Sequence, residues 1–144
     1  MRVLVDTCVW SIAFRGDDAR NKSTCEELEM LINENRVDII GPIKQEILSA
    51  YKETQRFEKI KRHLEYFPSL TPIDDDYIAA AKFYALCRSN GVQGSHIDLL
   101  SCAVSVRVRS CIFTFDRDFE FYSQFLPIVI YKSQGWKDFL DLNQ

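Results

Sequence analysis

The chain has 144 residues, a length that favours one compact domain spanning residues 1–144. Its composition, 47% hydrophobic and 27% charged, is that of a globular protein and excludes a disordered or collagen-like chain. The net charge of −3 argues against a passive nucleic-acid-binding module, which carries a basic surface, but allows an enzyme with an acidic cluster.

The cysteines and the apolar runs bear on where the protein works. The cysteines number five, and no two of them are spaced as C-x-x-C, a pattern that favours reduced thiols over disulfides or a zinc site. The apolar run after Met1 is too short for a signal peptide, and no stretch reaches the roughly 18 residues of a membrane span. We therefore expect a cytoplasmic protein with no membrane association.

The first half of the chain predicts two strands and three helical stretches. Ser23 with Glu26 and Thr24 with Glu27 fit the capping box that starts a helix. The expected elements are a strand at 3–5, a short helix at 10–14, a polar loop at 15–22, a helix from Ser23 or Thr24 to about 35, a strand at 38–41 and a helical stretch from Pro42 to about 67 that can break near Thr54.

The second half continues the alternation of strands and helices. The expected elements are a strand at 70–73 framed by Pro68 and Pro72, a helix from 74 to 90 ended by Gly91, a helix from Ser95 to about 109, strands at 111–115 and 128–131 around a helical turn at 119–125, and a terminal helix at 136–142. This order predicts a three-layer α/β/α domain with a mainly parallel five-stranded sheet. In such sheets, sites form at the carboxyl ends of strands, where Asp6 and Asp116 are expected.

Asp98 is the only acid in a strongly apolar helical segment, 97–108. A helix with that composition must be largely buried, and an ionised carboxylate there needs a partner or a metal ion because desolvating a lone charge is costly. The alternative is a capping box with Ser95, favoured further by the helix dipole. The two interpretations can both hold.

Glu46 lies on or beside the expected buried stripe of its helix, which includes Ile43 and Ile47, whereas Lys44 falls on the solvated face. Taken alone, Glu46 is explained better as a snorkelling or edge residue than as a functional one. Asp6 and Asp116 likewise have the alternative of turn or cap formation. It is the four placements together that point to a cation-binding cluster.

Four segments resemble the successive motifs of the PIN-domain family, and most of all its VapC-type ribonuclease toxins. They are Asp6-Thr7-Cys8-Val9-Trp10 after the first strand, Glu46 early in a later helix, Asp98-Leu99-Leu100-Ser101-Cys102-Ala103, and Thr114-Phe115-Asp116-Arg117-Asp118-Phe119. Their order and spacing extend the resemblance over essentially the whole chain. The sequence departs from the family at Cys8, where a small hydroxyl or amide residue is more usual, and in the lack of a second acid near Asp98.

The resemblance implies hydrolysis of RNA that leaves a 5′-phosphate and a 3′-hydroxyl. Carboxylate oxygens suit Mg²⁺, with Mn²⁺ able to substitute. We expect Asp6 and Asp98 as principal ligands, and Asp116 and Glu46 at a second ion or its waters. The hydroxyls of Thr7 and Thr114 would position waters or the phosphate. The resemblance also implies a small antitoxin partner and a homodimer.

Candidate contacts for RNA are Arg15, Lys44 and Arg117, each close to an acid in the sequence. Asp118 is expected to cap a helix rather than bind metal. Two other functions stay open: a PIN fold that binds RNA or a partner without cutting, and a receiver-type signalling domain, with Thr114 and Lys132 in the matching places but without paired acids after the first strand. A phosphatase with an Asp-x-Asp nucleophile is disfavoured because Cys8 occupies the second position.

Overall fold

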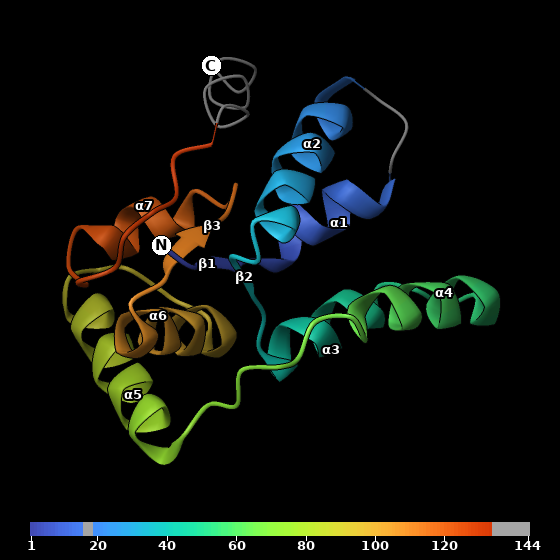
Figure 1. Cartoon of the computed structure of the whole chain (residues 1–144). Coiled ribbons are helices and arrows are strands. Elements are labelled where there is room, and N and C mark those ends of the chain that lie inside the picture. The colour runs from blue at the N-terminus through green and yellow to red at the C-terminus, as the bar shows by residue number, and fades with distance from the viewer. Residues whose placement is uncertain (16–18, 134–144) are drawn as a thin grey trace.

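The computed structural model describes residues 1–15 and 19–133, and in these the chain alternates short strands with helices (Figure 1). The elements are β1 (Val3–Val5), α1 (Thr7–Arg15), α2 (Ala19–Asn33), β2 (Val37–Asp38), α3 (Gly41–Ser49), α4 (Thr54–Leu64), α5 (Asp74–Ser89), α6 (His96–Val108), β3 (Cys111–Phe113) and α7 (Asp118–Ser123). The helix expected at 136–142 lies outside the described residues.

The sheet is parallel, with the order β2-β1-β3, so the expectation of an α/β fold with a parallel sheet is confirmed. The expectation of five strands is wrong: segments 70–73 and 128–131 contribute only isolated parallel bridges, Ile40 to Leu70 and Ile112 to Ile130. A proline has no N–H to give to a ladder, and prolines stand on both sides of Leu70 and just before the last segment. Pairing at both edges therefore stops after a single bridge.

Helices cover both faces of this sheet. Leu4 pairs with Ile112 and Val5 with Phe113, so the first pair faces one side and the second pair the other. Ile112 packs in a cluster with residues of α5, α6 and α7, whereas Phe113 belongs to a larger cluster with residues of α1 to α4 and with Leu100 and Val104 of α6. In Figure 1, α5 and α6 lie on one side of the strands and α1 and α2 on the other.

Several helix and strand bounds differ from expectation. Helix α1 begins at Thr7 and α2 at Ala19, ahead of the expected starts, and Thr24 is a buried interior residue of α2, not its cap. The break near Thr54 is confirmed, because α3 ends at Ser49 and α4 begins at Thr54. Both β2 and β3 are shorter than expected.

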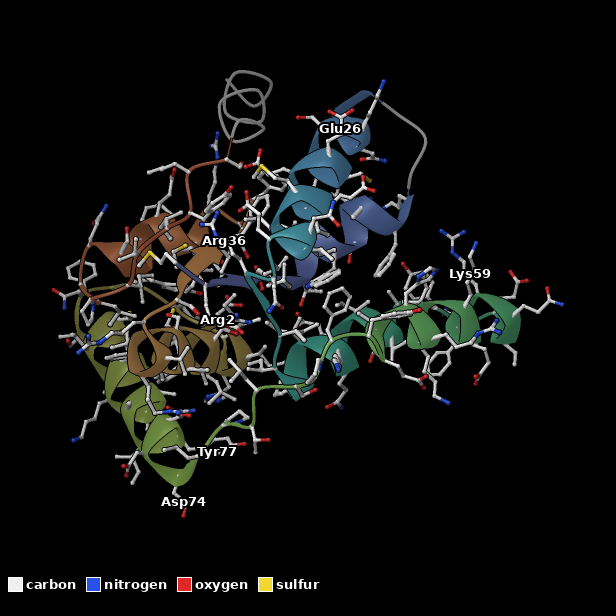
Figure 2. All side chains as sticks on the ribbon, in the orientation of Figure 1. Arg2, Glu26, Arg36, Lys59, Asp74 and Tyr77 are labelled. Atoms are coloured by element: carbon white, nitrogen blue, oxygen red, sulfur yellow. The ribbon has the colours of Figure 1, made fainter. Side chains whose placement is uncertain are left out.

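The outer helices carry their charged side chains outward. In Figure 2, Glu26 on α2, Lys59 on α4 and Asp74 at the tip of α5 point away from the strands, whereas Arg2 lies near the centre. No helix among the described residues is long and apolar enough to cross a membrane. Because these outer charged side chains point into solvent, we look for a functional site among the polar side chains close to the sheet.

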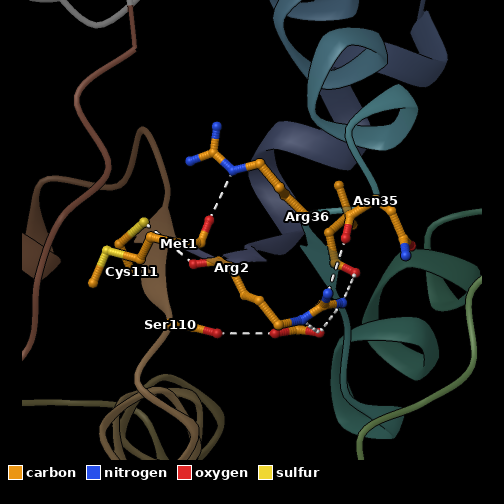
Figure 3. A network of polar contacts seen from close by, with 8 residues as sticks. Met1, Arg2, Asn35, Arg36, Ser110 and Cys111 are labelled. Atoms are coloured by element: carbon orange, nitrogen blue, oxygen red, sulfur yellow. Dashed lines mark hydrogen bonds and ion pairs between the residues drawn. The ribbon is translucent and has the colours of Figure 1, made fainter.

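One polar network holds the edge of the sheet at which β1 and β3 begin (Figure 3). Arg2 donates to the buried Asp38 carboxylate, with Nε 2.8 Å from Oδ1, and Ser110 donates to Oδ2 of the same group at 2.9 Å. Arg36 Nε donates to the carbonyl oxygen of Met1 at 2.7 Å. Asp38 is thus a structural acid that is paired with Arg2. It stabilises the side of the sheet where β1 and β3 begin, not the side where their carboxyl ends lie.

Candidate metal centre

Asp6 follows β1 directly and is almost completely buried, with 7% of its surface exposed. Its backbone N–H donates to the carbonyl of Phe113 at 2.9 Å, which continues the β1–β3 ladder. Thr114, the residue after β3, donates its hydroxyl to Asp6 Oδ2 at 2.8 Å and accepts the N–H of Asp116 at 3.0 Å. One hydroxyl therefore ties together the two acids that follow the neighbouring strands.

Glu46 reaches this edge from α3. The hydroxyl of Thr7, the first residue of α1, donates to Glu46 Oε1. Ile43 and Ile47 on the same helix are fully buried while Glu46 is exposed, so Glu46 lies at the rim of the buried stripe. Thr7 thereby holds Glu46 next to Asp6, and the two acids interact electrostatically.

Asp98 stands in the first turn of α6, where the expected cap is confirmed: the Ser95 hydroxyl accepts the Asp98 N–H at 3.1 Å. The Asp98 carboxylate has a partner that the sequence did not predict, because Tyr122 Oη donates to Asp98 Oδ2 at 2.9 Å. Tyr122 is completely buried in α7. The sequence does show that Tyr122 lies three residues after Phe119, on the same face of a helix. That spacing predicts a buried tyrosine, but it does not say which acid accepts the hydrogen bond from its hydroxyl.

The expectation that Asp118 caps a helix is wrong, because the N-cap of α7 is Arg117 and no side chain caps it. Asp98, Asp116 and Asp118 each place one carboxylate oxygen within 4.8 Å of the others. Asp118 is the first residue of α7, and its own N–H donates to Asp116 Oδ1 at 2.9 Å. Asp116 therefore closes the turn before α7, and Asp118 stands beside it at the exposed rim.

Burial and the charges of neighbouring acids raise the pKa values of several carboxyl groups in the site. Burial raises the pKa of Asp6, the hydrogen bond from Thr114 opposes this, and the charge of Glu46 adds to it. Burial and, to a smaller extent, the charges of Asp6 and Asp116 raise the pKa of Asp98 to about 6, against the hydrogen bond from Tyr122. Burial and the charge of Asp116 raise the pKa of Asp118. Crowded carboxylates shift in this way when no positive charge compensates them.

The whole fold is similar to that of several solved structures. FitAcB from Neisseria gonorrhoeae superposes with a TM-score of 0.74 at 17% identity, over 93% of this chain and 98% of that chain. VapBC2 from Rickettsia felis, solved with a DNA fragment from its promoter, gives 0.76 at 15% identity, over 93% and 100%. VapC20 from Mycobacterium tuberculosis, described as a sarcin-ricin loop cleaving toxin, gives 0.61 at 17% identity, over 90% and 99%.

This chain has the fold of the PIN-domain toxins. No protein-family profile matches its sequence, and no curated protein does either. The PIN fold was expected from the four motifs, and its structural likeness favours that interpretation over a receiver domain.

In this PIN fold the acids of the site differ in their partners from the buried acids Asp38 and Asp76. Asp38 is paired with Arg2, and Asp76 with Arg107, at 2.7 and 2.8 Å. Among the side chains of residues 1–15 and 21–133, no lysine or arginine forms an ion pair with Asp6, Glu46, Asp98 or Asp116. An unpaired cluster of negative charges near the carboxyl ends of parallel strands is suited to a cation.

The donor atoms select the kind of cation. The cluster offers carboxylate and hydroxyl oxygens, which are the ligands of hard cations such as Mg²⁺ and Mn²⁺. Cys8 lies inside the cluster, with its sulfur 3.6 Å from Asp6 Oδ2 and 3.3 Å from the N–H of Phe115. Burial and the charge of Asp6 raise the pKa of the Cys8 thiol to about 12, so without a bound metal the thiol stays protonated.

The three basic residues expected to contact RNA differ in how far their side chains are exposed to solvent. The ammonium of Lys44 donates to the carbonyl of Phe67 and is half-buried, so the expectation that it lies on a solvated face is wrong. Its role is to tie α3 to the segment after α4. Arg117 and Arg15 are exposed, and Arg117 stands between Asp116 and Asp118.

Proposed function

We propose that this protein is a metal-dependent ribonuclease and the toxin of a toxin–antitoxin pair. The observation that carries the proposal is a group of acids without a paired lysine or arginine in the described part of the chain: Asp98, Asp116 and Asp118 have carboxylate oxygens within 4.8 Å of one another, and Asp6 interacts electrostatically with Glu46 and Asp98. The fold supports it, since VapC20, which shares that fold, is described as cleaving the sarcin-ricin loop.

The proposed roles follow from the contacts. Mg²⁺ or Mn²⁺ held by Asp6 and Asp98, with Asp116 and Glu46 at a second ion or its waters, would supply an activated water and offset charge on the phosphodiester. Thr114 orients Asp6 and the backbone of Asp116, and Thr7 orients Glu46. Arg117 and Arg15 would then attract the RNA backbone to an otherwise acidic edge.

We propose a small antitoxin protein as the partner, since one structure with a similar fold is described as a toxin–antitoxin complex from Klebsiella pneumoniae. The antitoxin would cover the acidic edge and block RNA, and adding it should abolish cleavage at a stoichiometric ratio. We also propose a homodimer, to be tested by sedimentation of the purified chain. Such a role would place residues 1–144, as a single domain, in the cytoplasm, where the RNA is.

The test is cleavage of an end-labelled structured RNA by the wild-type protein in Mg²⁺, in Mn²⁺ and in EDTA. Asp6→Asn and Asp98→Asn are expected to lose at least about 100-fold in rate, because each removes one ligand charge from a shared site. Asp74→Asn is the matched control, since Asp74 is an exposed acid at the tip of α5 (Figure 2).

Cleavage that requires metal, survives Asp74→Asn and disappears in both site variants would establish the nuclease. Cleavage that persists in EDTA would contradict the metal-dependent mechanism. RNA binding without cleavage, unchanged in Asp98→Asn, would favour the alternative of a PIN fold that binds RNA or a partner without cutting.

A further inference from the structure

Tyr122 is the most deeply placed polar group that touches the acids. Its side chain is completely buried, yet its hydroxyl lies 2.9 Å from Oδ2 of Asp98, which is half-buried. The hydroxyl comes from α7 and the acid from α6, so the contact joins two elements across the site. A buried phenol must satisfy its hydroxyl somewhere, and here it does so on an acid of the cluster.

The position of the phenol is set by its surroundings. Its ring packs edge-to-face on Phe119 with centroids 5.1 Å apart, in the cluster that contains Cys87, Leu99 and Cys102. An ionised carboxylate can only accept hydrogen bonds, so the phenolic proton of Tyr122 is directed to Asp98.

We propose that Tyr122 is a positioning residue that holds the Asp98 carboxylate in the orientation in which it binds a divalent cation. This inference rests on the proposed function. A donor to Oδ2 restricts rotation of the carboxylate, so less ordering is left for the cation to impose. Partners of this kind, which orient metal ligands without touching the ion, typically change metal affinity 10- to 100-fold when they are removed.

The chain offers a matched control. Tyr131 donates its hydroxyl to Glu27 Oε1 at 2.6 Å, also a phenol-to-carboxylate bond, but to an acid on α2 outside the cluster. Tyr122→Phe and Tyr131→Phe each remove one hydroxyl and keep the aromatic ring. A purely structural role predicts that both variants lose stability and that neither changes metal binding.

The experiment measures Mn²⁺ affinity directly, by titration calorimetry and by the electron paramagnetic resonance signal of free Mn²⁺. We expect Tyr122→Phe to weaken Mn²⁺ binding by about 10- to 100-fold and Tyr131→Phe to leave it within about twofold. In an Asp98→Asn background, Tyr122→Phe should cause no further loss, because the ligand it positions is gone. The thermal unfolding of each variant reports whether it is folded.

Equal Mn²⁺ affinity in wild-type protein and a folded Tyr122→Phe variant would overturn the inference while leaving the proposed function intact. A further loss of affinity from Tyr122→Phe in the Asp98→Asn background would also overturn it, because Tyr122 would then act through another group. Absence of Mn²⁺ binding in the wild-type protein would instead refute the proposed function, and this inference with it.

Discussion

At the scale of single residues, Asp98 carries the clearest consequence of a cluster without counter-ions. Its pKa is raised to about 6 by burial and by the charges of Asp6 and Asp116, from an ordinary value of 3.8. Without metal, the folded protein therefore binds a proton at Asp98 more tightly than the unfolded chain does. Ionising Asp98 favours unfolding, and this cost develops as the pH rises from about 4 to about 6.

We predict that Asp98→Asn stabilises the metal-free protein above pH 6 but not below pH 4. The expected gain is on the order of 2 kcal/mol at pH 7.5, since Asn cannot ionise. Urea unfolding in EDTA between pH 4 and pH 8 measures the free energy of unfolding of both proteins. If the difference in free energy of unfolding between the two proteins stays constant over this pH range, the pKa of Asp98 is not raised in the folded protein, and the prediction is wrong.

At the scale of elements, the helix that carries Asp98 depends on its packing against α5. Asp76 is 1% exposed, in the first turn of α5, and accepts from Arg107 Nε of α6 at 2.8 and 3.0 Å. Burial alone would raise the pKa of Asp76, but the bonds from Arg107 and from the Ile73 N–H lower it. The pair thus joins the start of α5 to the last turns of α6 and holds the register of the two helices.

We predict that Arg107→Met lowers the free energy of unfolding by about 2 kcal/mol, because it leaves a buried carboxylate without its partner. The half-exposed arginine keeps this below the cost at a fully buried pair. Lys61→Met is the control: it breaks the pair with Glu58, which is 3.6 Å long with both side chains about half exposed, and should cost less than about 0.5 kcal/mol. Urea unfolding at pH 7.5 compares them, and equal costs would contradict the structural role of Arg107.

At the scale of the whole molecule, the proposed ligands come from parts of the chain that only folding brings together. Asp6 follows β1, Glu46 is in α3, Asp98 is in α6 and Asp116 precedes α7. An unfolded chain cannot gather them, so a cation that binds them binds the native state alone. Its binding free energy is then added to the stability of the fold.

We predict that Mn²⁺ or Mg²⁺ raises the melting temperature of the protein. At a hundred times the dissociation constant the gain is about 2.7 kcal/mol, which for a domain of this size shifts the melting temperature by roughly 5 to 10 °C. Differential scanning fluorimetry at pH 7.5 with and without EDTA measures the shift. Asp98→Asn should show a much smaller shift, and an unchanged wild-type curve at millimolar metal would argue against the cluster.

The sequence by itself determined the alternation of strands and helices, the acids after β1 and β3, and the cap at Ser95, because all of these are written in local patterns of apolar and polar residues. The tertiary structure decided how many strands pair, because the segments at 70–73 and 128–131 each form only a single bridge although both were expected to be strands. It also decided two contacts between distant residues. The Tyr122 hydroxyl donates to Asp98, 24 residues away, and the Lys44 ammonium donates to the carbonyl of Phe67, 23 residues away. Contacts between helices depend on how they cross and which side chains meet there, and local periodicity does not encode either.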